Sequence, residues 1–303
     1  MQREFYDRLI DILDRESVLL EEPMKKHTTF RIGGAADYFV MPKNTEEVKG
    51  VLVLCKEAGI PYYVLGNGSN LLVSDNGFRG VIIQLYKNMK DIQVHGTMIR
   101  AQVGALLSQI AAEALKHKLT GFEFAAGIPG TLGGAVVMNA GAYGGEMKDV
   151  LFEVTALTPE GEVKVLKKEE LDLGYRTSVI GKKGYIALEA VLELQEGNEE
   201  DIRSTMDDLK ERRTTKQPLE YPSAGSTFKR PEGYFAGKLI QDTGLQGFSV
   251  GGAQVSEKHC GFVINKGNAT AKDVAELMRE VSDRVEKKFG VPLEPEVKKL
   301  GDF

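Results

Sequence analysis

The sequence contains few of the residues from which metal centres and disulfide frameworks are built. Among its 303 residues there are two cysteines, Cys55 and Cys260, which lie far apart and fit no metal-ligand spacing. Such a pair is more typical of a reducing compartment than of a secreted disulfide scaffold. The four histidines are scattered along the chain, which argues against a zinc site. We therefore expect no bound metal.

Long apolar runs and a basic excess are also absent. No apolar run has the length of a membrane-spanning helix, and the charged, amphipathic N-terminus is not typical of a signal peptide. We expect a cytoplasmic protein with no membrane partner. The net charge is -5, and no basic stripe with interleaved aromatic residues is present, which argues against a nucleic-acid partner. A small-molecule substrate is favoured instead.

Glycine, by contrast, is abundant and unevenly distributed. The chain has 34 glycines, about 11% of its residues against a typical value of about 7%. Eight of them lie between Gly121 and Gly145, a stretch whose one charged residue is Glu123. This composition indicates that something approaches the backbone closely there.

The first part of the chain has the pattern of a βαβ unit. After an amphipathic helix with Phe5, Leu9, Ile10 and Leu13 on its apolar face comes the strand-like ADYFVMP, which ends at Pro42. Asn44 and Glu47 then favour a helix start, and the helix runs to about Ala58. A second strand, PYYVLG, follows, and we expect it to be parallel to the first. It leads into GNGSN, residues 66–70, at the strand end where α/β sheets bind ligands.

The remainder predicts a second α+β domain and a third region. Between Val81 and about Asn198, short strands surround one helix near 105–117; the strand segments are VIIQLY, DIQVH, MIRAQVG, LFEVTALTP, EVKVL and YIALEAVLELQ. The Glu160–Gly161 pair predicts a hairpin turn. Residues 198–215 predict a polar connecting helix. Near the C-terminus, Thr270 as N-cap, Asp273 in the first turn and Gly290 as stop predict a well-defined helix.

Two glycine loops could present backbone N–H groups to a phosphate. GNGSN lacks the third glycine of a Rossmann fingerprint, because that place holds Leu71. Its backbone can still form an anion-binding nest, to which Ser69 and Asn70 would add side-chain donors. The second loop, residues 130–135, leads into a short helix. Neither loop contains Lys or Arg, which suits a pyrophosphate held by backbone donors. Close packing of helix on sheet is the alternative explanation for the glycines.

The segment PSAGSTFKRP, residues 222–231, carries one central serine before two basic residues. Ser226 is not in a nucleophile elbow, because Ala224 and Phe228 stand where that motif needs glycines. The segment is not a Walker phosphate loop either, since no lysine follows Gly225 directly. Taken locally, a solvated turn between its two prolines is the simplest alternative.

Several of these segments, taken together and in order, resemble one family of flavoenzymes. They are TTFRIGG (28–34), LGNGSNLLVSDNGFRG (65–80), GFEFAAGIPGTLGGAVVMNAGAYGG (121–145), GYRTS (174–178), AGSTFKRP (224–231), AGKLIQDTGLQG (236–247), GGAQVSEKH (251–259) and LEPEV (293–297). The chain resembles the UDP-N-acetylenolpyruvoylglucosamine reductase family, also called UDP-N-acetylmuramate dehydrogenases, in its shorter, type II form. The resemblance spans nearly the whole chain.

This resemblance implies an α+β fold in three parts. Two FAD-binding subdomains of the vanillyl-alcohol oxidase/p-cresol methylhydroxylase type are expected at 1–80 and 81–205. A C-terminal α+β substrate-binding domain is expected at 206–303, with the residues near 293–303 returning to the active site. The implied reaction takes a hydride from NADPH to FAD and then from flavin N5 to the enolpyruvyl group of UDP-N-acetylglucosamine enolpyruvate, giving UDP-N-acetylmuramate for peptidoglycan synthesis.

The resemblance also assigns residues to the cofactor. FAD is expected to be bound non-covalently, because no histidine lies in the first glycine loop, where covalent relatives attach it. The residues that carry over as FAD-binding are Gly66, Asn67, Gly68, Ser69, Asn70, Leu71, Pro129, Gly130, Thr131, Gly133, Gly134, Ala140, Gly141, Ala142 and Tyr143.

The catalytic residues implied by the family are Arg176, Ser226 and Glu296. Arg176 would stabilise negative charge that develops beside the substrate carboxylate. Ser226 would deliver the proton to carbon, and we predict that Glu296 is protonated or paired with Arg176 when substrate is bound. Without the family, Arg176 and Glu296 would read as an ordinary surface arginine and an exposed acid.

The substrate-binding residues implied by the resemblance are Tyr175, Lys216, Lys229, Arg230, Gln246 and His259. Gln246 and His259 depart from the residues of long-form members, and the extra tyrosine-bearing segment of those members is absent. His259 has the alternative of being a turn histidine with internal partners.

Two other functions stay open at the level of sequence. A sugar or lactone oxidase on the same flavin fold would account for residues 28–145, but not for AGSTFKRP or LEPEV. A non-catalytic nucleotide-sugar-binding protein would account for the basic residues near Ser226, but not for two separate pyrophosphate loops.

Overall fold

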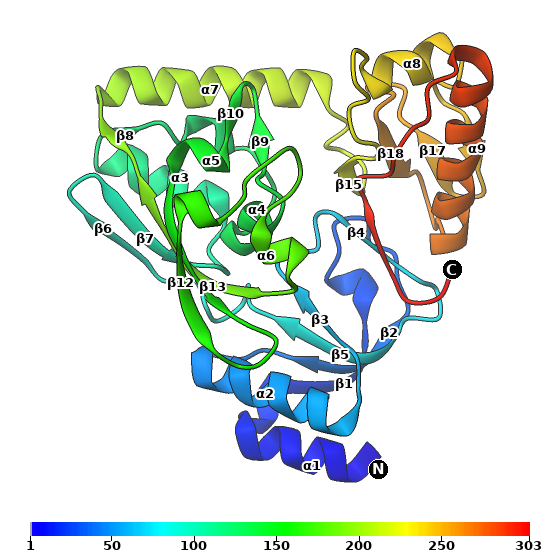
Figure 1. Ribbon diagram of the computed structural model, residues 1–303. Coiled ribbons are helices and arrows are strands. Elements are labelled where there is room, and N and C mark those ends of the chain that lie inside the picture. The colour runs from blue at the N-terminus through cyan, green and yellow to red at the C-terminus, as the bar shows by residue number, and fades with distance from the viewer. Residues whose placement is uncertain (1) are drawn as a thin grey trace. The chain divides into compact units, whose positions relative to one another are not determined.

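The computed structural model describes residues 2–303, and the chain divides into two compact units, each made of three segments (Figure 1). The first unit comprises the residues up to Leu20, Tyr38–Asn67 and Gly80–Arg212. The second comprises Glu21–Asp37, Gly68–Arg79 and Arg213–Phe303. The boundary therefore passes through the first glycine loop, between Asn67 and Gly68. The predicted division into three domains stays a prediction.

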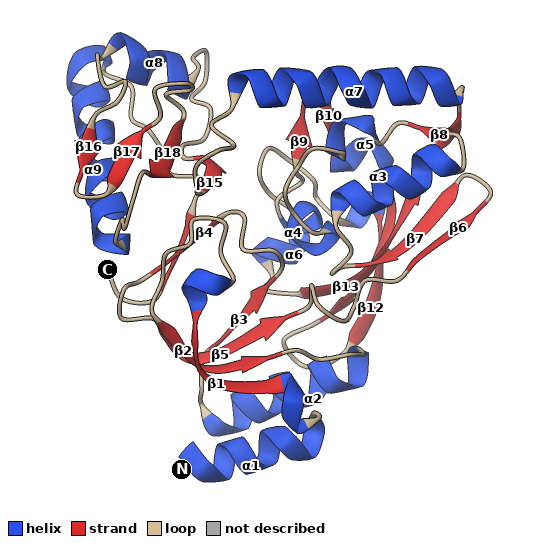
Figure 2. Cartoon of the chain, turned by 180° about the vertical axis from the view of Figure 1, so that it is seen from behind, coloured by secondary structure: helices blue, strands red, loops and turns tan. Residues whose placement is uncertain are grey.

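A four-stranded sheet of order β1-β2-β5-β3 belongs largely to the first unit. Its strands and the helices beside it are α1 (Gln2–Ile12), β1 (Val18–Pro23), β2 (Ala35–Val40), α2 (Thr45–Ala58), β3 (Tyr62–Leu65) and β5 (Phe78–Gln84). Figures 1 and 2 show α1 and α2 side by side on one side of this sheet. The predicted start of α2 is confirmed, because the Asn44 side chain accepts from the Glu47 N–H at 2.9 Å. Burial raises the pKa of the Cys55 thiol on α2 to about 12, so this cysteine packs as an apolar side chain.

The strand expected over 81–86 does not belong to the second sheet, where the sequence placed it. It lies in the first sheet as β5, paired in parallel with β3 from Tyr62↔Val81 to Leu65↔Gln84. Val81, Ile82 and Ile83 are all fully buried. A parallel strand covered on both faces reads as a continuous apolar run, so its sequence does not reveal which sheet it joins.

An antiparallel sheet of order β12-β11-β13-β7-β6 follows in the first unit. The strands are β6 (Ile92–His95), β7 (Met98–Gln102), β11 (Leu151–Leu157), β12 (Val163–Lys167) and β13 (Ile186–Glu193), and the predicted helix is α3 (Leu107–Lys116). The hairpin turn between β11 and β12 is confirmed, with Gly161 at φ +86°.

Shorter elements complete the first unit. They are β8 (Leu119–Thr120), α4 (Leu132–Val137), β9 (Gly141–Ala142), β10 (Gly145–Glu146), α5 (Met147–Val150), α6 (Val179–Lys182) and β14 (Gln195–Glu196). The predicted polar connecting helix is α7 (Glu199–Lys216), whose side chains are mostly exposed. The unit boundary falls within α7, after Arg212.

The second unit contains a sheet of order β15-β18-β17-β16 and the helices α8 and α9. The bounds are β15 (Ser223–Ser226), α8 (Ala236–Asp242), β16 (Ser249–Val250), β17 (Ala253–Val255), β18 (Phe262–Asn265) and α9 (Ala271–Phe289). A parallel pair, β4 (Leu71–Val73) and β19 (Lys298–Leu300), belongs to the same unit. The predicted limits of α9 are confirmed, since Thr270 accepts from the Asp273 N–H and Gly290 ends the helix at φ +68°.

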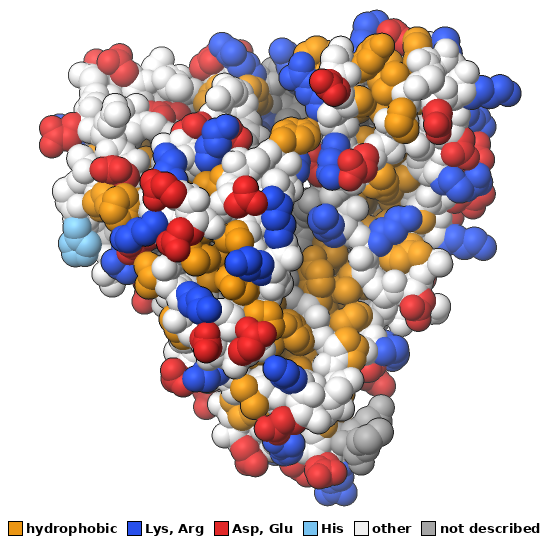
Figure 3. Space-filling view, viewed as in Figure 1, with side chains coloured by type: hydrophobic (Ala, Val, Ile, Leu, Met, Phe, Trp, Pro, Cys, Tyr) orange, Lys and Arg blue, Asp and Glu red, His pale blue; other side chains and the backbone are white. Residues whose placement is uncertain are grey.

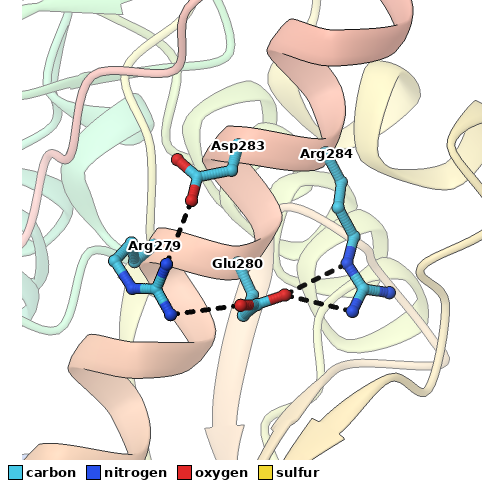
Figure 4. Close-up of polar contacts among 4 residues, drawn as sticks. All are labelled: Arg279, Glu280, Asp283 and Arg284. Atoms are coloured by element: carbon cyan, nitrogen blue, oxygen red, sulfur yellow. Dashed lines mark hydrogen bonds and ion pairs between the residues drawn. The ribbon is translucent and has the colours of Figure 1, made fainter.

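The two sides of α9 differ sharply. Its buried stripe consists of Val274, Leu277, Met278, Val281 and Val285. On the outer side, Arg279 binds Glu280 and Asp283, and Arg284 binds Glu280, at N–O distances of 3.0–3.2 Å (Figure 4). Such exposed pairs add little stability. Figure 3 shows basic and acidic side chains interspersed over the face that it displays. None of the described helices is both long and apolar enough to cross a bilayer.

We expect Leu277→Ala to lower the free energy of unfolding by about 2–5 kcal/mol, because Leu277 is fully buried in the core of the second unit. Glu276→Ala, on the exposed side of the same helix, should change it by less than about 0.5 kcal/mol. Urea unfolding followed by circular dichroism measures both. Equal effects of the two substitutions would show that the α9 stripe does not form this core.

Candidate active site

The two glycine loops contact each other within the first unit. A Cβ on Gly66 would lie 2.4 Å from Thr131 Oγ1, so only glycine allows this approach. One residue later, Asn67 Nδ2 donates to the Pro129 carbonyl at 2.9 Å. The structure thus brings together two loops that lie more than 60 residues apart in the sequence.

The first loop presents unpaired backbone donors. Within residues 2–303, none of the backbone N–H groups from Gly66 to Asn70 donates to a protein acceptor. These residues are buried or half-buried, where an unsatisfied N–H is costly. The loop is held from outside instead, since Gly68, at φ +63°, accepts from the Thr29 N–H at 3.2 Å. This donor set fits the pyrophosphate of a dinucleotide.

The glycines of the second loop differ in their contacts. The Gly133 N–H donates to the Val103 carbonyl at 2.8 Å, and a Cβ on Gly133 would lie 2.9 Å from the Val103 Cβ. Gly133 therefore lets α4 pack closely on the chain after β7 and has no N–H left for a ligand. Over the part of the chain that the structure describes, the N–H groups of Thr131 and Gly134 donate to no protein acceptor.

Ser226 lies at an irregular end of β15. Opposite β18, Ser223 pairs with Ile264 and Ser226 with Phe262, so the strand bulges between them. Gly225 occupies the bulge at φ +76°, a conformation that glycine adopts without strain. Ser226 is exposed at this point. Bulges of this kind reorient a side chain.

The C-terminal tail brings Glu296 beside Ser226. The Glu296 N–H donates to the Thr227 carbonyl at 2.9 Å, and the Lys229 N–H donates to the Glu294 carbonyl at 2.8 Å. An isolated antiparallel bridge joins Phe228 and Pro295 between these two bonds. The backbone of Glu296 is therefore hydrogen-bonded to Thr227, the residue that follows Ser226, although the two positions are about 70 residues apart in sequence.

Asn70 belongs to the same frame. The sequence assigned its side chain to an anion, but Asn70 Nδ2 donates to the Glu296 carbonyl at 3.2 Å. The Asn70 carbonyl accepts from the Lys298 N–H at 3.1 Å, where β19 begins its parallel pairing with β4. The first glycine loop thus continues directly into the strand that holds the tail, and the Asn70 side chain has a structural partner.

Two bracing residues were missed by the sequence reasoning. Thr29 Oγ1 donates to the Ser223 carbonyl at 2.6 Å, while its N–H binds Gly68. Asp75 accepts from the N–H groups of Ala271 and Lys272, at the start of α9. TTFRIGG and the residues after GNGSN contributed to the resemblance, but nothing local to either segment identifies a partner about 200 residues away.

Arg176 and Tyr143 occupy the tips of two tight turns in the first unit. Gly174 and Thr177 exchange backbone hydrogen bonds around Tyr175 and Arg176, and Arg176 has φ +55°. Tyr143, between β9 and β10, has φ +54°. Bulky residues are strained in this region of φ. Arg176 and Tyr143 thus hold a backbone conformation in which glycine would be less strained.

The residues expected to bind substrate have the following contacts. Lys229 forms an ion pair with Glu294, and the Arg230 guanidinium carbon lies 4.0 Å from the centre of the Phe235 ring. Gln246 donates to the Glu257 carbonyl, and Lys216 is the exposed last residue of α7. The ring of Tyr175 is exposed, and the Arg176 guanidinium carbon lies 5.5 Å from its centre. His259 accepts from the Gly261 N–H through Nδ1 at 3.1 Å and packs edge-on against Phe262. The residue is exposed as a whole, yet burial of its ring lowers the pKa of His259. This supports the turn-histidine alternative.

Comparison with known proteins identifies the family of this chain. Residues 217–300 match the family described as UDP-N-acetylenolpyruvoylglucosamine reductase, C-terminal domain, and residues 36–167 match the family described as FAD binding domain. The chain is 56% identical over 300 residues to the UDP-N-acetylenolpyruvoylglucosamine reductase of Clostridioides difficile (strain 630), covering 99% of each chain. It belongs to the UDP-N-acetylenolpyruvoylglucosamine reductase family.

Solved structures agree with family membership. The UDP-N-acetylenolpyruvylglucosamine reductase of Thermus caldophilus is 38% identical, with a TM-score of 0.80, and the match covers 94% of this chain and 98% of that one. A glucose dehydrogenase, 15% identical with a TM-score of 0.50 over 65% of this chain and 44% of that one, shares the fold alone. The predicted α+β fold and the FAD cofactor of this reductase family are confirmed.

The lowered pKa of His259 predicts a pH dependence of stability. The unfolded chain takes up this proton first, so the stability due to neutral His259 is present above about pH 6.5 and is lost as the pH falls below it. When the pH is lowered from about 7.5 to about 5.5, the melting temperature of His259→Gln should therefore fall by less than that of the unmodified protein. His95→Gln, on the exposed side of β6, is the control. An unchanged pH profile in His259→Gln would contradict the burial of this ring.

Proposed function

We propose that this chain catalyses the NADPH-dependent, FAD-mediated reduction of UDP-N-acetylglucosamine enolpyruvate to UDP-N-acetylmuramate in peptidoglycan precursor synthesis. One observation carries the proposal. The Glu296 N–H bonds to the Thr227 carbonyl, and Asn70 bonds to Glu296, so the serine, the acid and the first glycine loop share one frame. A sugar oxidase would not account for the match of residues 217–300.

The proposed cofactor site fits the residues present. The N–H groups of residues 66–70, together with those of Thr131 and Gly134, would hold the FAD pyrophosphate through backbone donors. Bound FAD supplies the chemistry of hydride relay from NADPH to the enolpyruvyl methylene. Because its N–H bonds to the Val103 carbonyl, Gly133 would shape this site without donating to the phosphates, whereas Asn70 Nδ2 uses one of its two donors on the Glu296 carbonyl and keeps the other for a ligand.

Arg176 has the charge that the developing carbanion requires. Hydride addition to the methylene places negative charge on the adjacent carbon and, by conjugation, on the substrate carboxylate. A guanidinium can bind both carboxylate oxygens at once, and it stabilises this charge more strongly in the transition state than in the ground state. The position of Arg176 at the tip of its turn, at φ +55°, supports this role.

Ser226 supplies the proton. Its Oγ would donate to the carbon beside the carboxylate, and the reaction then needs no strong acid, because a carbanion is far more basic than an alkoxide. Glu296, whose backbone N–H bonds to the Thr227 carbonyl directly after Ser226, would assist as a protonated or Arg176-paired acid that adds no uncompensated negative charge. The Gly225 bulge leaves Ser226 exposed for this donation.

The remaining assignments complete the proposal. Tyr175, Lys216, Lys229, Arg230, Gln246 and His259 would contact the nucleotide-sugar substrate. We further propose a cytoplasmic enzyme whose FAD-binding subdomains are 1–80 and 81–205, followed by a substrate-binding domain at 206–303.

Ser226→Ala tests the proposed proton transfer. The variant should be reduced by NADPH at nearly the rate of the unmodified enzyme, but its re-oxidation by UDP-N-acetylglucosamine enolpyruvate should slow by about 10²- to 10⁴-fold. Stopped-flow absorbance of the flavin separates the two half-reactions.

Ser204→Ala, an exposed serine on α7, is the matched control and should change neither half-reaction. Equal loss in both half-reactions of Ser226→Ala would show that this serine has a structural role. Re-oxidation by molecular oxygen alone, in the unmodified enzyme, would contradict the proposed substrate.

A further inference from the structure

One buried amide joins the glycine-rich segment to the turn that carries Arg176. Asn139, 1% exposed, follows α4 at φ +44°. The Ala140 N–H donates to the Ala135 carbonyl at 2.9 Å and the Asn139 N–H to the Val136 carbonyl at 3.4 Å, which is the Schellman arrangement of a helix end. Glycine is the usual residue at this position and asparagine the next most tolerant. The choice of asparagine is explained by its side chain.

The Asn139 side chain is fully engaged. Nδ2 donates to the Gly174 carbonyl at 3.1 Å and to Glu146 Oε2 at 2.8 Å, and Oδ1 accepts from the Lys148 N–H at 2.8 Å. A backbone N–H faces the oxygen and a backbone carbonyl faces the nitrogen, so the orientation of the amide is determined by its partners. A buried side chain with every polar group paired is rigid.

Gly174 is the base of the Arg176 turn. It exchanges hydrogen bonds with Thr177 at 3.1 and 3.3 Å, which leaves Tyr175 and Arg176 at the tip. On the far side of the turn, the fully buried Ser178 donates from Oγ to the Val137 carbonyl at 2.8 Å. One end of the turn is therefore tied to Asn139, just after α4, and the other to Val137, the last residue of α4, the helix that begins at the second glycine loop.

We propose that Asn139 is a positioning residue that holds the Arg176 guanidinium in place for the reduction. The inference rests on the proposed function of Arg176. A residue in the left-handed conformation keeps it only while its surroundings enforce it. Loss of the Asn139 bond to Gly174 frees one end of the turn, and a displacement of about 1 Å at a catalytic group can slow a reaction by about 100-fold.

Asn139→Gly tests this role while keeping the backbone conformation, because glycine is favoured at this helix end. FAD affinity and flavin reduction by NADPH should stay within about threefold of the unmodified enzyme, while re-oxidation by UDP-N-acetylglucosamine enolpyruvate slows by about 10- to 100-fold. Hydrogen exchange of the peptide covering residues 171–180 should become faster. Asn139→Ser, which lacks the amide donors and adds no second carboxylate beside Glu146 Oε2, should give the same pattern if the glycine variant does not fold.

The matched control is Asn268→Gly. Asn268 has φ +53° and is exposed, and its side chain makes no hydrogen bond within the described chain. The same substitution in the same backbone conformation should therefore leave both half-reactions and the 171–180 exchange unchanged.

A double-mutant cycle separates this inference from the proposed function. In an Arg176→Ala background, Asn139→Gly should slow re-oxidation by less than about twofold further, because the group it positions is gone. If Arg176→Ala itself re-oxidises at the normal rate, the proposed role of Arg176 fails. If Arg176→Ala is slow but Asn139→Gly is normal, the positioning role alone is overturned. A full additive effect, or equal loss in both half-reactions, would show that Asn139 is only structural and would also overturn it.

Discussion

The hydrogen bond from the Glu296 N–H to the Thr227 carbonyl is the constraint on which the site in the second unit depends. It pairs the C-terminal tail with the residues after Ser226, so that the backbone of Glu296 lies opposite Thr227, the residue that follows the serine. The same tail then bonds to Asn70 and pairs with β4. The local sequence around Ser226 gives no sign of this pairing and is explained equally well by a solvated turn between two prolines.

The backbone N–H groups of the first glycine loop differ from those of the C-terminal tail. Gly68 and Asn70 of this loop are held by hydrogen bonds to Thr29, Glu296 and Lys298, while within residues 2–303 the N–H groups from Gly66 to Asn70 donate to no protein acceptor. Backbone donors that are fixed before the ligand arrives cost little reorganisation when an anion binds. The loop is therefore held by hydrogen bonds to its carbonyls, while its backbone N–H groups are left for a ligand within the described residues 2–303. This arrangement suits a cofactor site.

Local signals predicted α2 and α9 well, because Asn44, Thr270 and Gly290 act on their own helix ends. The sheet of β5 could not be predicted, since a strand buried on both faces shows no alternation. The family resemblance supplied the candidate residues but not their arrangement. The structural role of Asn70 depends on a partner 226 residues later, and no turn sequence indicates the left-handed conformation of Arg176.

Amide hydrogen exchange, measured by NMR with and without FAD, tests most directly whether the tail is hydrogen-bonded before FAD binds and whether the N–H groups of residues 66–70 become bonded only when it binds. The account predicts slow exchange for Thr227, Lys229 and Glu296 in both states, because their N–H groups are already bonded. It predicts fast exchange for residues 66–70 without FAD and strong protection with FAD. Protection of the loop without FAD, or free exchange at Glu296, would contradict it.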